Sequence, residues 1–170
     1  MTFTQAVKSG FENALNFSGR SRRPDYWWFF LFVFAGAFVL SLGQMAMGMT
    51  GNWLVRLFQL VTFVPFLAVG WRRLQDTGRP GWVLLVPVAI VVLSSIIVGS
   101  LSASMMQGGF GTMMHGGPVG DMPMGRMQGQ AGLVTLLAVA QFIAGIVIIW
   151  WMSRPSQRGD NRFGPEPRVR

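Results

Sequence analysis

Three short segments of the sequence gather arginine, aspartate and asparagine side chains: NFSGRSRRPDYW at 16–27, RRLQDTGRPGW at 72–82 and NRFGP at 161–165. The planar guanidinium of arginine binds a carboxylate or a phosphate through two parallel hydrogen bonds. The segments are therefore suited to ion pairing or to anion binding. The candidate residues are Arg20, Arg22, Arg23, Asp25, Arg72, Arg73, Asp76, Arg79, Asn161 and Arg162.

Two interpretations of these residues remain open at this point. In the first, they form a structural ion-pair network that fixes the loops, with Asp25 beside the arginine pair 72–73 and Asp76 beside the pair 22–23. In the second, the surplus of arginines binds an anionic lipid headgroup or another ligand that carries phosphate. A divalent cation on the two aspartates is disfavoured because the neighbouring arginines would repel it.

The residues that usually support catalysis are scarce. The chain has no cysteine and one histidine, which excludes thiol chemistry and leaves no histidine cluster for a metal. Neither the phosphate-binding pattern G-x-x-x-x-G-K-[ST] nor the nucleophile pattern G-x-S-x-G occurs. We therefore expect a protein that is not an enzyme and that carries no cofactor.

Four apolar stretches must position the polar segments: residues 26–43, 53–70, 82–101 and 133–152. About 20 helical residues cross a hydrocarbon core of ~30 Å, so each stretch is long enough to span a membrane. The composition agrees, because 51% of the residues are hydrophobic and 12% are charged, about half the charge of an average soluble domain. We predict an all-α integral membrane four-helix bundle that forms a single membrane domain over 1–170.

An amphipathic helix is predicted ahead of the first span, at 2–17. Phe3, Val7, Phe11 and Leu15 recur every four residues and form one apolar stripe. We expect this N-terminal amphipathic helix to be interfacial and to lie on the inner surface of the membrane; the alternative is that it packs against the bundle.

The net charge of +8 would suggest nucleic-acid binding in a soluble protein, but its distribution favours a membrane explanation. All lysines and arginines except Arg56 and Arg126 fall in the N-terminal segment, in the loop between the second and third spans, or in the C-terminal tail, residues 153–170. Four spans place these three regions on one side. The positive-inside rule then predicts that both termini are cytoplasmic.

The three polar segments, in this order and at span boundaries, resemble the domain-of-unknown-function 805 family of small bacterial inner-membrane proteins. That family has a GR-x-SR-x-EYW-like start, an RRLHDTGRSGWW-like middle and an N-[RK]-[YF]-G-P end. Here Asp25 replaces glutamate, Gln75 replaces histidine and Pro80 replaces serine. The resemblance implies a multi-pass protein of the bacterial cytoplasmic membrane and assigns no activity.

A segment rich in glycine and methionine, residues 102–132, lies between the third and fourth spans and is predicted to be a flexible outer loop. Its thioethers and one imidazole suggest a Cu(I) site, because soft sulfur ligands select this ion. The alternative is that methionine only fills space in a weakly ordered loop. The candidate metal ligands are Met113, Met114, His115, Met122 and Met124.

The favoured hypothesis is a non-enzymatic membrane protein whose arginine-rich cytoplasmic face binds anionic lipid or a protein partner. A transporter or channel subunit is one alternative, although no acidic or histidine residue lies within a predicted span to form an ion pathway. Periplasmic Cu(I) binding is the other. We expect the protein to contact the lipid bilayer and not to bind nucleic acid. The sequence leaves open whether it also binds anionic phospholipid, a second copy of itself or another membrane protein.

Overall fold

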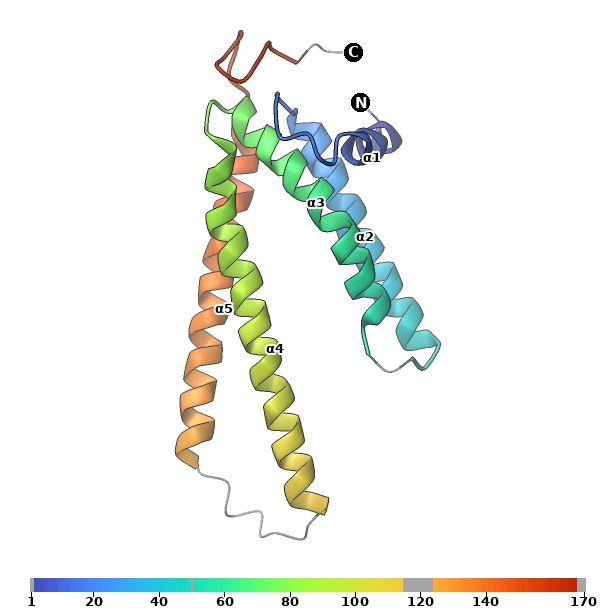
Figure 1. Ribbon diagram of the computed structural model, residues 1–170, viewed down its shortest axis with the longest axis vertical. Helices are drawn as coiled ribbons and strands as arrows, with labels where there is room; N and C mark the ends of the chain where they lie inside the picture. The colour runs from blue at the N-terminus through green and yellow to red at the C-terminus, as the bar shows by residue number, and fades with distance from the viewer. Residues whose placement is uncertain (1, 50, 115–123, 168–170) are drawn as a thin grey trace. The chain divides into compact units, whose positions relative to one another are not determined.

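The computed structural model describes residues 2–49, 51–114 and 124–167, and it describes side chains for these residues except 102 and 104–128. The described chain is helical, as predicted (Figure 1). Its elements are α1 (Phe3–Glu12), α2 (Arg23–Ala46), α3 (Trp53–Asp76), the 3-10 helix η1 (Gly81–Leu84), α4 (Leu85–Met114) and α5 (Met124–Ser153).

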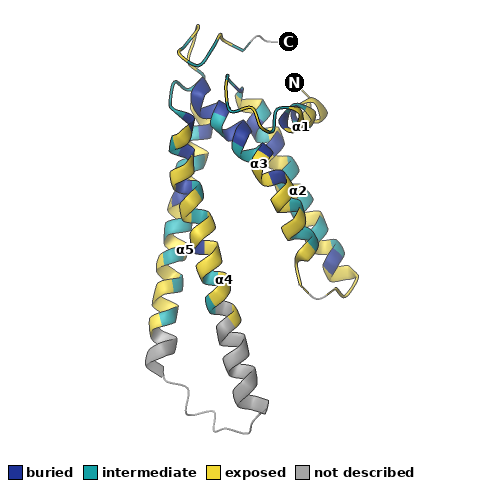
Figure 2. Cartoon of the chain, in the orientation of Figure 1, coloured by how far each residue is buried: buried dark blue, intermediate teal, exposed yellow. Residues whose placement is uncertain are grey.

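Four helical segments are long and apolar enough to cross a membrane: Arg23–Ala46, Trp53–Asp76, Gly81–Leu101 and Gly129–Ser153. Each contains one of the four predicted spans, so that prediction is confirmed. Their mean hydropathies are 2.0, 1.7, 2.6 and 2.5. Few residues in the apolar windows of these segments are buried, between 6% and 28% (Figure 2), as expected for helices whose apolar surface faces lipid rather than water.

Helix occupies both ends of the segment predicted as an outer loop. Helix α4 continues to Met114 and α5 begins at Met124, although the apolar spans end at Leu101 and begin at Gly129. Methionine and glutamine are good helix formers, and their propensity is consistent with these extensions. Residues 115–123 lie outside the described chain.

The chain divides into two compact units, which are described separately. The first unit comprises Met1–Leu84 and Trp150–Arg170, and the second comprises Leu85–Ile149. In the first unit α2 and α3 run side by side (Figure 1). Gly36 permits this approach, because a Cβ atom there would lie 2.6 Å from Cζ of Phe58.

Helix α1 packs against α2 in the first unit. Its N-terminus is closed by a capping box, in which Thr2 Oγ1 accepts a hydrogen bond from Gln5 N and Gln5 Oε1 accepts one from Thr2 N. The ring of Phe3 lies 5.9 Å from that of Trp28, and Phe11 lies 5.6 Å from Phe29. Two residues of the apolar stripe, Phe3 and Phe11, therefore pack against α2. Leu15 lies beyond the end of α1 and is 81% exposed, and contact of the helix with lipid stays a prediction.

Burial in the first unit is greatest at the polar end of α3, not along the apolar spans (Figure 2). From Ala68 to Asp76 every residue except Trp71 is buried. This run includes the charged residues Arg73 and Asp76, which have no exposed surface. Buried charges are costly unless they are paired. Arg73 and Asp76 must therefore have partners within the first unit.

In the second unit α4 and α5 are joined by a polar contact inside their apolar segments. Gln141 Nε2 donates to Ser95 Oγ at 3.0 Å and to the carbonyl of Val91 at 3.5 Å. The hydroxyl of Ser95 in turn donates to that same carbonyl at 2.6 Å. Such bonds satisfy polar groups that lipid cannot hydrate.

Candidate functional site

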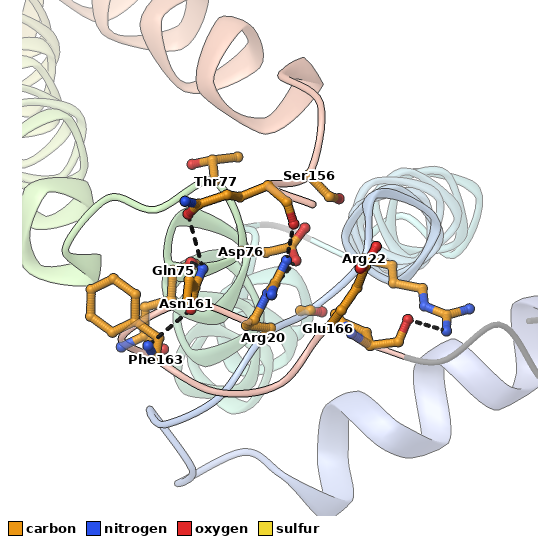
Figure 3. Close-up of polar contacts among 12 residues, drawn as sticks. Arg20, Arg22, Gln75, Asp76, Thr77, Ser156, Asn161, Phe163 and Glu166 are labelled. Atoms are coloured by element: carbon orange, nitrogen blue, oxygen red, sulfur yellow. Dashed lines mark hydrogen bonds and ion pairs between the residues drawn. The ribbon is translucent and has the colours of Figure 1, made fainter. Parts of the chain in front are cut away.

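The carboxylate of Asp76, the last residue of α3, is held between two guanidinium groups. Arg20 Nε donates to Oδ1 at 2.9 Å (Figure 3), and Arg73 Nη1 donates to Oδ2. The three side chains are 0–1% exposed. The pair Arg73–Asp76 is local, three residues apart on one helix face, whereas Arg20 comes from the segment before α2. The sequence prediction that Asp76 pairs with an arginine of 22–23 is therefore wrong.

The same two arginines hold the C-terminal tail through its backbone. Arg20 Nη1 donates to the carbonyl of Gly159 at 2.6 Å, and its Nη2 donates to that of Gln157. Arg73 donates to the carbonyls of Met152 and Arg154 and, at 3.1 Å, to Ser156 Oγ. Every guanidinium nitrogen of both arginines thus donates to a protein oxygen. We call these contacts, together with the two ion pairs, the Asp76 network.

The NRFGP segment fixes the returning tail to the end of α3. Asn161 Nδ2 donates to the carbonyl of Gln75 at 3.0 Å, and Asn161 Oδ1 accepts from the backbone N–H of Phe163 at 2.9 Å. Gly164 has a φ of 140°, a conformation that side chains disfavour. It closes the turn with two backbone bonds to Asn161. The asparagine and the glycine of this segment therefore have identifiable structural roles.

Asp25 caps α2 and forms no direct ion pair with Arg72 or Arg73 within the described chain. It nevertheless lies close enough to both arginines to interact with them electrostatically, so it lies beside this pair as predicted, without a contact. Its Oδ2 accepts from the backbone N–H of Arg22 at 3.0 Å and from Ser21 Oγ at 3.4 Å. The reason is local: an acidic residue in the first helical turn, after a proline at 24, is well placed to accept unpaired N-terminal donors. Its Oδ1 is buried and has no hydrogen-bond partner.

Three other predicted site residues lie apart from the carboxylate of Asp76. Arg72 donates to the carbonyl of Ala68 at 3.2 Å and to that of Asn13 at 3.5 Å. The guanidinium of Arg79 lies 5.5 Å from the ring of Trp150, and that of Arg162 lies 4.6 Å from the ring of the following Phe163. These distances are typical of cation–π contacts.

Arg22 and Arg23, which precede and begin α2, line a pocket of about 240 Å³. Arg22 Nη2 donates to the carbonyl of Pro167 at 2.6 Å, and Arg23 Nε donates to that of Arg154 at 2.8 Å. Pro24, Ser156, Glu166 and Pro167 complete the lining. We call this the Arg22–Arg23 pocket; one wall comes from the start of α2 and the other from the tail.

The region 14–117 matches the family model described as "Protein of unknown function (DUF805)". The chain belongs to the DUF805 family. The E. coli (strain K12) protein named inner membrane protein YhaI is 41% identical over 75 residues, which cover 44% of this chain and 64% of YhaI. Inner membrane protein YhaH of the same organism is 26% identical over 163 residues, 93% of this chain and 92% of YhaH. No solved structure matches.

These similarities and the four candidate spans make this DUF805 protein a multi-pass protein of the bacterial inner membrane. The match to YhaI spans less than two thirds of that protein's length. The printed names assign no activity to either relative.

The tail residues of the site could not be selected from the sequence of this DUF805 protein. Ser156, Gln157, Gly159 and Glu166 carry no motif, and the arginines reach two of them through backbone carbonyls. One signal was available: the basic residues of the three segments outnumber the acidic ones, so some guanidinium groups must find other acceptors. The sequence does not say which ones.

The predicted metal ligands Met113, Met114, His115, Met122 and Met124 all lie outside the residues whose side chains are described. A Cu(I) site there stays a prediction.

Proposed function

We propose that this DUF805 protein is a non-enzymatic binding protein of the inner membrane that holds the phosphate of a phospholipid headgroup in the Arg22–Arg23 pocket. One observation carries the proposal. The Asp76 network uses every guanidinium nitrogen of Arg20 and Arg73. Arg22 and Arg23 line one pocket, and each bonds through a single guanidinium nitrogen to the described part of the chain.

The free donors suit a phosphate group. A guanidinium binds phosphate oxygens through two N–H groups, and each basic residue near a membrane surface contributes about 1 kcal/mol of attraction to anionic lipid. Position also supports a lipid ligand. Trp27 follows about one helical turn after Arg23 and is half-buried, and indole rings favour the headgroup level of a bilayer.

The state of the two aspartates supports binding rather than catalysis. Both oxygens of Asp76 are bound to arginine, and Asp25 caps a helix. A general acid or base must be able to exchange a proton with a substrate. The carboxylates of the predicted site are instead engaged in structural contacts.

We further propose that both termini face the cytoplasm. The contacts of Arg20 with Gln157 and Gly159 support a common side for the N-terminal segment and the tail. The basic residues of these regions favour the cytoplasmic leaflet, whose surface is negatively charged.

Native mass spectrometry from nanodiscs of phosphatidylglycerol tests the binding function. The variant Arg22→Gln/Arg23→Gln should retain at least about tenfold less phospholipid, because it removes the guanidinium N–H groups that would bind the phosphate, and a hydrogen bond to a charged group contributes about 1.5–3 kcal/mol. Lys8→Gln/Arg158→Gln removes the same charge outside the pocket and should retain lipid as the wild type does. Equal retention by all three proteins, or equal loss in both variants, would contradict the proposal.

A further inference from the structure

The Arg22–Arg23 pocket carries both signs of charge. Glu166 lines it together with Arg22 and Arg23, and Figure 3 shows Glu166 and Arg22 near each other. Within the described chain, the ion pairs involve Lys8–Glu12, Arg20–Asp76 and Arg73–Asp76, so Glu166 neutralises neither Arg22 nor Arg23 by direct pairing. Opposite charges therefore face one cavity without contacting each other.

Glu166 is held in this place by the tail itself. Its Oε2 accepts a hydrogen bond from the backbone N–H of Gly159 at 2.8 Å, and its own N–H donates to Asp160 Oδ1 at 3.1 Å. The carbonyl of Gly159 is in turn bound by Arg20. The Asp76 network thereby restrains the segment that presents the carboxylate. Oε1 of Glu166 accepts no hydrogen bond from residues 2–49, 51–114 or 124–167 and is available to a ligand.

A simple anion does not explain this pocket well, because a carboxylate beside the arginines would repel it. A ligand with a phosphate at one end and an ammonium at the other meets both charges. We propose that the Arg22–Arg23 pocket takes an aminophospholipid headgroup, with the phosphate on Arg22 and Arg23 and the ammonium on Glu166. This inference rests on the proposed binding function and names the headgroup.

Ser156 adds a further donor to the phosphate side. Its Oγ accepts a hydrogen bond from Arg73 Nη1 at 3.1 Å, so its own O–H remains able to donate, as a hydroxyl does both. Ser156 lines the pocket with Arg22 and Arg23. The pocket thus offers three donor side chains, those of Arg22, Arg23 and Ser156, to phosphate oxygens and one carboxylate to an amine.

The experiment is a competition in nanodiscs made from equal amounts of phosphatidylethanolamine and phosphatidylglycerol, with bound lipid identified by native mass spectrometry. Both lipids carry the phosphate, and only the first carries the amine. The wild type should retain phosphatidylethanolamine preferentially. Glu166→Gln should lose that preference while it retains as much total lipid, because glutamine keeps an oxygen for Gly159 N–H. Glu166→Asp keeps the charge and should keep a preference.

Glu12→Gln is the matched control, because Glu12 is an exposed acid outside the pocket; it should behave as the wild type. If retention depends on Arg22 and Arg23 but phosphatidylethanolamine is not preferred, or Glu166→Gln changes nothing, this inference fails and the proposed function stands. If retention does not depend on Arg22 and Arg23, both fail. If soluble phosphoethanolamine, at a concentration equal to that of the lipid, displaces the bound lipid, the ligand of the pocket is a free metabolite and the proposal of a lipid ligand is wrong.

Discussion

Arg20 and Asp76 are 56 residues apart in the chain, and Arg20 Nε donates to Asp76 Oδ1 at 2.9 Å with both side chains almost fully buried. This ion pair joins the segment before α2 to the end of α3. Because Arg20 and Arg73 also bind tail carbonyls, one carboxylate organises all three polar segments. The Asp76 network is therefore the central support on which the Arg22–Arg23 pocket depends.

Asp76→Asn should destabilise the protein strongly. Removing one partner from a buried ion pair leaves an uncompensated charge and costs about 3–5 kcal/mol, and here two arginines would lose their anion. We expect a large decrease in the unfolding midpoint of the detergent-solubilised protein, measured by intrinsic tryptophan fluorescence.

The exposed acid Glu12 provides the control, since loss of its surface pair with Lys8 should change the midpoint little. A double-mutant cycle with Arg20→Gln and Asp76→Asn should give a clear coupling energy, as expected for residues in direct contact. Additive effects of the two substitutions would show that the ion pair does not contribute as described.

Asn161→Ala should release the tail. The substitution removes the bond from Nδ2 to the carbonyl of Gln75 and the acceptor for Phe163 N–H. We expect trypsin to cleave after Arg158 faster in the variant than in the wild type, because protease attack follows local opening. Ser153→Ala, at an exposed position, is the control. An unchanged cleavage rate in Asn161→Ala would mean that this asparagine does not hold the tail.

The sequence predicted the features that depend on many residues at once, namely the apolar spans and the distribution of basic residues. Long apolar stretches predicted the four spans, and the number of spans predicted that the polar segments would lie on one side of the membrane. Pairing was not predictable, because the local geometry of a helix start assigns Asp25 to the backbone N–H of Arg22 rather than to a distant arginine. Backbone carbonyls such as that of Gly159 are acceptors in every residue, so no side-chain pattern indicates which ones an arginine will bind.

Gly36→Ala tests the packing of α2 on α3. The added Cβ would lie 2.6 Å from Cζ of Phe58, so the ring or a helix must move. We expect a loss of about 1–3 kcal/mol in the free energy of unfolding, the usual cost of overpacking, measured by thermal unfolding in detergent. Gly43→Ala in the same helix meets nothing within 4 Å and should be neutral or slightly stabilising. Combination with Phe58→Leu should recover part of the loss in Gly36→Ala.

The proposed orientation can be tested with single cysteines, because the chain has none of its own. Ser18 lies in the segment before α2, and Met49 lies beyond the opposite end of that helix, where it is 44% exposed. A thiol reagent that does not cross the inner membrane should label Met49→Cys in intact cells and should label Ser18→Cys only after the membrane is permeabilised. The physical reason is the basic charge around Ser18, which favours retention on the cytoplasmic side.

Arg158→Cys in the tail should behave as Ser18→Cys does, since Arg20 joins the two regions. The reverse labelling pattern would place the Arg22–Arg23 pocket on the periplasmic side and remove the electrostatic argument for cytoplasmic lipid, whereas different labelling of Ser18→Cys and Arg158→Cys would contradict the contacts between them.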